Sequence, residues 1–263
     1  MSCAWRFVAP VAVSLCVTQP AHAIVNTEEL RVQEPVAGFS GNFAAAIGGQ
    51  TGNTDKSDVS IGSRLTWYEK PITNFIVFNY DYGKTGGARD TNKGFLHARH
   101  VHGITERLAW EAFAQAQKDE FTRLTYRGLL GGGARIVAYK AHDDRLKLIT
   151  GIGAFYSREK LSEEAGTTDA GIDKLVRGNF YFVVMYHLND TVSLGSTTYY
   201  QPATSDFGDF RALEQAALRV VLTHTLDLKI SLDMAYDSRP PQPCKAWPVQ
   251  NGGPWPPVSI CWR

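Results

Sequence analysis

The chain has 263 residues and almost balanced charge, with 27 basic and 26 acidic residues and a formal net charge of +1. Such a chain carries no basic field that would attract nucleic acid, so nucleic acid is not supported as a partner. After the N-terminal segment, no apolar stretch is long enough to form a transmembrane helix, so a membrane-spanning form would have to cross with strands.

Residues 1–23 have the pattern of a secretory signal peptide. A single charge at Arg6 precedes an apolar run from Phe7 to Val17, and the small-residue triplet Ala21-His22-Ala23 follows. We predict export through the Sec pathway, cleavage after Ala23, and a periplasmic segment over residues 24–37. Losing Arg6 leaves 26 of the 27 basic residues against 26 acidic ones, so the mature protein is formally neutral.

Residues 38–241 repeat a pattern typical of strands. Segments rich in aromatic, β-branched and small residues are separated by clusters of Gly, Asn, Asp, Thr and Lys. In the clearest segment, 226–237, every second residue is large and apolar and most of the others are polar, which gives one apolar face and one polar face. Eleven segments follow this rule: 39–49, 57–68, 74–83, 94–103, 107–117, 123–139, 145–157, 174–188, 191–201, 209–222 and 226–237.

The predicted connections alternate between short turns and longer polar loops. The longer loops are 50–56, 83–93, 158–173 and 202–208. Transmembrane barrels have short periplasmic turns and longer external loops, so the first strand would rise from the periplasm. The fold prediction is therefore all-β: an antiparallel up-and-down transmembrane β-barrel, with loops 83–93 and 158–173 outside.

Soluble β-sandwiches and barrels also alternate apolar and polar residues along their strands, so alternation alone does not distinguish them from a membrane barrel. The residues on the polar face do. This face carries more charges, of both signs, than a soluble interior tolerates. We predict a lumen-facing charge set consisting of Arg64, Asp81, Arg99, Glu111, Arg127, Arg135, Arg177, Arg219 and Asp233.

Two readings of this charge set stay open. The charges form a plug of mutual pairs, or they line a narrow water-filled path that prefers anions. The plug is favoured because a barrel of about twelve strands is narrow and buried charges need partners.

The tail, residues 242–263, breaks the strand pattern. It holds five prolines, three tryptophans, and both cysteines of the mature chain, Cys244 and Cys261. Proline cannot donate to a strand ladder, so most of this tail is not an ordinary central strand. The two cysteines either pair in an oxidising periplasm or remain free thiols.

Several short segments carry a resemblance to a known family. They are Gly38-Phe39-Ser40-Gly41-Asn42, Gly49-Gln50-Thr51-Gly52-Asn53-Thr54, Trp67-Tyr68, Tyr80-Asp81-Tyr82 and Asp237-Ser238. Over about residues 37–241 the chain resembles the salt-induced outer-membrane proteins of Gram-negative bacteria, also called domain of unknown function 481. The resemblance implies an outer-membrane barrel of about twelve strands, and it brings no established substrate, catalytic set or cofactor.

The tail departs from that family. Relatives continue past the proline pair into a final amphipathic strand ending in an aromatic residue, which the barrel-assembly machinery is expected to read. This chain instead ends with Val258-Ser259-Ile260-Cys261-Trp262-Arg263. Two hypotheses explain this: an altered reading frame near the proline pair that removed the last strand, or a divergent closing segment from Val258 to Trp262. The change in composition favours the first.

No residues with catalytic or metal-binding spacing were identified. His97, His100 and His102 share one predicted strand, but alternation puts His97 on one face and the other two on the opposite face. Two ligands fall short of a zinc site. The sequence also lacks a G-x-S-x-G elbow, an H-E-x-x-H helix and a phosphate-binding glycine loop. We therefore predict no catalytic, cofactor-binding or metal residues.

The function prediction is a non-enzymatic outer-membrane barrel of unknown physiological role, structural or narrow-pored. Its expected partners are outer-membrane lipid and the barrel-assembly machinery. The sequence does not indicate which small-molecule ligand, if any, the protein binds. The alternative is a soluble exported β-barrel that binds a small apolar ligand. A third reading is an outer-membrane hydrolase.

Overall fold

The computed structural model describes residues 37–163, 168–223 and 226–241. The signal peptide, residues 24–36 of the periplasmic segment, and the tail with Cys244 and Cys261 lie outside the described residues. The predictions made for them therefore stay predictions.

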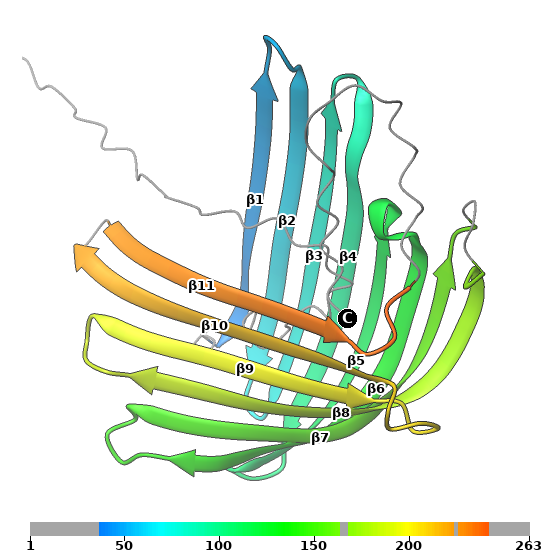
Figure 1. Cartoon of the computed structure of the whole chain (residues 1–263). Coiled ribbons are helices and arrows are strands. Elements are labelled where there is room, and N and C mark those ends of the chain that lie inside the picture. The colour runs from blue at the N-terminus through cyan, green and yellow to red at the C-terminus, as the bar shows by residue number, and fades with distance from the viewer. Residues whose placement is uncertain (1–36, 164–167, 224–225, 242–263) are drawn as a thin grey trace, which may run out of the picture.

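Eleven strands form one antiparallel sheet, and each strand pairs with the next one in sequence (Figure 1). The strands are β1 (Gly38–Gln50), β2 (Lys56–Glu69), β3 (Ile72–Thr85), β4 (Ala88–Gly103), β5 (Leu108–Asp119), β6 (Leu124–Lys140), β7 (Leu146–Leu161), β8 (Gly171–His187), β9 (Val192–Pro202), β10 (Phe210–Thr223) and β11 (Leu226–Asp237). One turn of 3-10 helix, η1 (Glu120–Thr122), joins β5 to β6. The all-β, antiparallel up-and-down prediction is confirmed.

The described part of the chain contains no helix long and apolar enough to cross a membrane.

The sheet is strongly coiled, so that the first strands run at a steep angle to the last ones (Figure 1). Two side-chain contacts show that the sheet curls around an inner face, because each joins strands three apart in the order. Tyr181 on β8 reaches Glu111 on β5, and Arg211 on β10 reaches Glu159 on β7. Among the described residues β1 and β11 have one paired neighbour each, so each keeps an edge with free ladder groups.

The loop predicted over residues 83–93 is wrong for most of its length. Strand β3 runs to Thr85 and β4 begins at Ala88, which leaves a two-residue turn of Gly86 and Gly87. Both glycines have positive φ, 60° and 79°, as a tight hairpin turn requires. The polar residues on either side continue the ladder, because strand pairing uses backbone groups and does not need an apolar side chain.

Two connections at one edge of the sheet are longer than the turns at the other edge. Residues 162–170 join β7 to β8 and residues 203–209 join β9 to β10 at what we call the loop edge. The predicted 158–173 loop is therefore shorter than expected, because β7 continues to Leu161. At the opposite turn edge, β2 and β3 are joined by residues 70–71 and β8 and β9 by residues 188–191.

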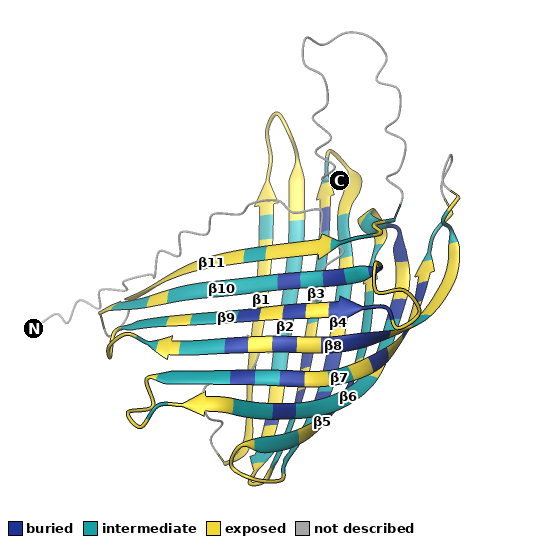
Figure 2. Cartoon of the chain, turned by 60° about the horizontal axis from the view of Figure 1, so that its bottom comes forward, coloured by how far each residue is buried: buried dark blue, intermediate teal, exposed yellow. Residues whose placement is uncertain are grey.

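The two faces of the sheet differ in chemistry. Alternate residues along the strands are large, apolar and exposed on the outer face; examples from seven strands are Ile76, Leu96, Leu130, Ile152, Phe180, Leu194 and Ile230. Their neighbours in sequence point to the inner face, and those of Ile76, Leu96 and Phe180 are buried. Buried and exposed segments therefore alternate along β8 and β9 (Figure 2). The two-residue period of the strand decides this separation.

Candidate functional site

The inner face of β4, β5, β6 and β8 carries a buried network around Glu111. An Arg99 Nη1 atom lies 3.4 Å from one carboxylate oxygen of Glu111, and these side chains are only 3% and 1% exposed. The Tyr181 hydroxyl donates to the other oxygen at 3.0 Å and accepts from Arg135 at 3.2 Å. Glu111 therefore holds together side chains from strands that are not neighbours.

A second network crosses β6, β7, β10 and β11. Arg127 Nε donates to Glu159 Oε2 at 2.7 Å, and Arg211 Nη2 donates to the same oxygen at 3.2 Å. Arg211 also donates through Nε to Asp237 at 2.8 Å. Two guanidinium groups thus face two carboxylates, which is the balance that buried charges require.

Two further arginines fasten the connections at the loop edge. Arg177 donates to the Asp209 carboxylate at 2.8 Å and to the carbonyl oxygens of Gln201 and Asp209 at 3.3 Å. Arg123 donates at 2.8 Å both to Asp169 and to the carbonyl of Ser162. Each planar guanidinium has several donors, so one side chain fixes both a strand end and a loop.

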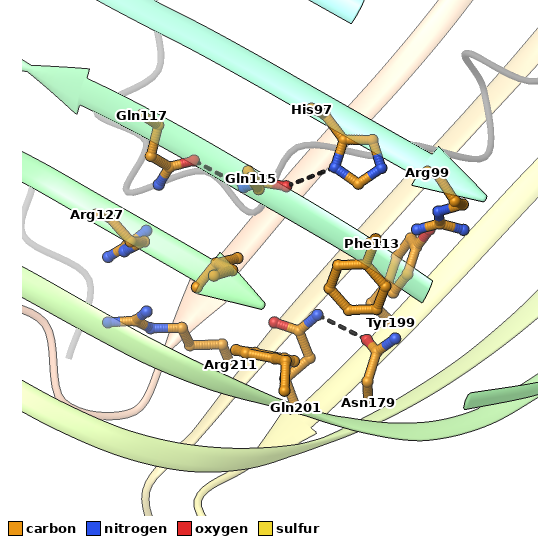
Figure 3. Close-up of a pocket in the computed structure, with 12 residues that line it drawn as sticks. His97, Arg99, Phe113, Gln115, Gln117, Arg127, Asn179, Tyr199, Gln201 and Arg211 are labelled. Atoms are coloured by element: carbon orange, nitrogen blue, oxygen red, sulfur yellow. Dashed lines mark hydrogen bonds between the residues drawn. The ribbon is translucent and has the colours of Figure 1, made fainter. Parts of the chain in front are cut away.

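A small cavity lies among these groups (Figure 3). Its walls are made by His97, Arg99, Phe113, Gln115, Gln117, Arg127, Leu129, Phe155, Asn179, Tyr199, Gln201 and Arg211, with no acidic residue among them. The cavity measures about 30 Å³, room for about one or two water molecules. Sites for small organic ligands are roughly ten times larger or more. The cavity can therefore hold water or a small ion.

His97 lies in the wall of this cavity on the inner face. Its ring packs 6.2 Å from that of Phe95 and 6.0 Å from that of Phe113, measured between centroids. Its Nδ1 is 3.2 Å from the Gln115 side-chain oxygen (Figure 3). The histidine is thus held by aromatic packing and one amide.

His100 and His102 point to the outer face near the turn edge. His100 Nδ1 is 2.7 Å from the Asn74 amide oxygen, and the ring of Trp110 lies 4.8 Å from that of His100 and 5.9 Å from that of His102. The three histidines of β4 therefore do not converge. Within the ranges that the structure describes, no group of three His, Cys, Asp or Glu residues is placed to hold a metal ion.

The structure brings together five of the nine residues predicted to line the lumen. Arg99, Glu111, Arg127, Arg135 and Arg177 are all buried on the inner face. Two of these arginines pair with carboxylates outside the predicted set: Arg127 pairs with Glu159, and Arg177 pairs with Asp209.

The other four lie away from the two networks. Arg64 places its guanidinium 4.9 Å from the Phe75 ring centroid, and Asp81 is 3.6 Å from Lys93. Arg219 forms an ion pair with Asp227 in which the side chains are 51% and 40% exposed. Asp233 accepts a hydrogen bond from Gln215. Arg219 is exposed, and the other three are half-buried.

Sequence reasoning missed several members of the networks, although the same alternation points to them. Glu159 follows Ser157 at the two-residue period, but the predicted strand ended at residue 157. Arg211 shares its face with Arg219, and Asp237 shares its face with Asp233, so both were available from the pattern.

Fold and inner face together define a class: an up-and-down antiparallel β protein with an apolar outer surface and a charged interior. The family model described as "Protein of unknown function, DUF481" matches residues 43–245. The chain belongs to this family, as the sequence resemblance predicted. Neither a curated protein nor a solved structure matches the chain.

Two carboxylates of β11 allow a matched test of the inner network, because each pairs with an arginine of β10. Asp237→Asn removes one of the two carboxylate partners of the buried Arg211 and should lower the free energy of unfolding by about 3 kcal/mol. Asp227→Asn removes the partner of the exposed Arg219 and should cost less than about 1 kcal/mol. Urea unfolding of the full chain in detergent micelles measures both. Equal effects would contradict a structural role for the buried network.

Proposed function

We propose that the protein is an outer-membrane β-barrel whose outer face contacts lipid and whose interior is filled by paired charges. The observation that carries this proposal is the inverted polarity of the sheet. Leu130 and Ile152 are 67% and 54% exposed, whereas Arg127 and Glu159 on the inner face of the same two strands are buried. Contact with lipid stabilises an apolar surface of this extent, whereas contact with water destabilises it.

The same observation weighs against the soluble alternative. A soluble barrel that binds a small apolar ligand needs an apolar interior with a sizeable cavity. The inner cavity is small, and three arginines and four amide side chains lie in its wall beside apolar and aromatic ones.

The proposed role is structural and non-enzymatic. The sequence has no G-x-S-x-G elbow to supply a nucleophile, and labelling by a serine-directed probe would contradict this part of the proposal. Localisation in the cell outer membrane, export after cleavage at Ala23 and induction by salt belong to the same proposal and are supported by the family resemblance.

Depth in the membrane gives a test of the outer face. Ile152→Lys places a charge in the middle of β7 and should cost about 2–4 kcal/mol of unfolding free energy in lipid vesicles, because the ammonium must enter hydrocarbon. The control Ile47→Lys, near the loop end of β1, should cost at most about 1 kcal/mol. If both variants are as stable as the parent in detergent-free buffer, the outer face does not contact lipid.

Barrel closure is tested by heat-modifiability on gels of outer-membrane fractions. A closed barrel migrates faster when unheated. The comparison is between the full chain and a version in which the residues after Pro241 are replaced by an amphipathic strand ending in phenylalanine. A shift on heating by the full chain means that its own tail supports folding in the membrane. A shift by the replaced version alone means that the barrel needs a closing strand, and a shift by neither refutes the membrane proposal.

Conductance separates the plug from a narrow anion path. The paired networks around Glu111 and Glu159 favour a plug, so the full chain in planar bilayers should show little conductance. The second candidate, an anion-preferring path, draws support from the cavity, whose wall has three arginines and no acidic residue. A steady conductance with anion preference would replace the plug by this second candidate.

A further inference from the structure

Three cations lie next to one another on the outer face of β7 and β8, close to the loop edge. Arg158 and Lys174 are directly opposite each other in the antiparallel ladder, and Lys160 is two residues beyond Arg158, opposite Ile172. All three are exposed. Residues two apart on a strand are separated by roughly 7 Å and opposite residues by roughly 5 Å, so the three positive charges share one small patch.

Within residues 37–163, 168–223 and 226–241, no carboxylate forms an ion pair with this patch. Like charges directly opposite each other destabilise a sheet. Among the described residues none of the three makes a side-chain ion pair, and the carboxylate between Arg158 and Lys160, Glu159, faces inward to Arg127 and Arg211. A counter-charge from outside the chain would relieve the repulsion.

The patch also lies at a defined height. Tyr126 pairs with Lys160 across the ladder, and Tyr156 precedes Arg158 by two residues on the outer face, so aromatic rings adjoin the cations. Tyrosines on the outer face mark the level of the membrane interface. Cations just beyond that level lie where lipid headgroups are.

Strands β3 and β5, farther along the sheet, repeat the arrangement. Lys118 on β5 places its ammonium 5.4 Å from the centroid of the Tyr80 ring, and Lys84 on β3 lies 5.8 Å from that of Tyr82. The patch therefore belongs to a belt of cations beside tyrosines on the loop-edge side. Long basic side chains of this kind cover an aromatic ring while their charge reaches the polar layer.

The turn edge provides a contrast within the same molecule. Lys140 there lies 2.9 Å from Asp144, and Arg145 lies 3.6 Å from Asp143. These cations are compensated by carboxylates of the same turn.

We propose that Arg158, Lys160 and Lys174 form a binding site for a phosphorylated lipid headgroup in the outer leaflet. This inference rests on the proposed function, which puts the loop edge outside. The Arg158 guanidinium offers a planar pair of donors for a phosphate, and the two ammonium groups add charge around it. The acyl chains of such a lipid would run along the apolar residues of the outer face, Tyr156 and Val176 among them.

The test uses the full chain folded in phosphatidylcholine vesicles, with lipid A carrying both phosphates as the probe. Binding is measured by native mass spectrometry and by titration for the parent, for Arg158→Gln/Lys160→Gln/Lys174→Gln and for the control Lys140→Gln/Arg145→Gln. Each cation near a charged surface contributes about 1 kcal/mol, so the triple variant should bind roughly 100-fold more weakly. The control should bind as the parent does.

Further controls test whether the phosphates of the lipid are recognised and whether the variants fold. Lipid A without its phosphates should bind the parent as weakly as intact lipid A binds the triple variant. Inorganic phosphate should not displace lipid A from the parent. If the triple variant does not fold, Lys174→Gln alone takes its place, and it should bind lipid A about fivefold more weakly than the parent. If all proteins shift on heating but bind lipid A equally, this site is wrong and the membrane proposal stands. If the parent never folds into vesicles, both fail.

Discussion

Burial of arginine on the inner face is the constraint on which the rest of the structure depends. A guanidinium removed from water needs a carboxylate and further acceptors at short range. Here those partners come from other strands: Glu159 on β7 receives Arg127 from β6 and Arg211 from β10. The sheet must therefore coil far enough to bring such strands together. The interior charges and the curvature of the sheet each require the other.

The same coiling leaves the apolar side chains on the outside. In a soluble β protein the apolar face would be the one enclosed, with the charges in water. This chain turns its charges to the inner face instead, and in the proposed outer-membrane setting lipid around the sheet would supply the hydrophobic contribution. The cation patch of Arg158, Lys160 and Lys174 then lies where the apolar outer face ends and the headgroup layer would begin.

The strand pattern was predictable because alternation is local. All eleven strands lie within a few residues of the segments read from the sequence, since side-chain direction repeats every two residues whatever the partner strand is. Arg99, Glu111 and Arg177 were assigned to the inner face on the same basis. Strand ends were less predictable: Glu159 and residues 88–93 were placed in loops, because ladders continue through polar residues once both strands are aligned.

The sequence by itself determined the all-β class, the order of strands, the face of each side chain and the family. Only the tertiary structure decided which charges meet. Arg127 and Arg211 converge on Glu159, while Arg219 remains with the exposed Asp227. The physical reason is that alternation fixes the direction of a side chain, whereas the distance between side chains on non-adjacent strands depends on the twist and coiling accumulated over the whole sheet.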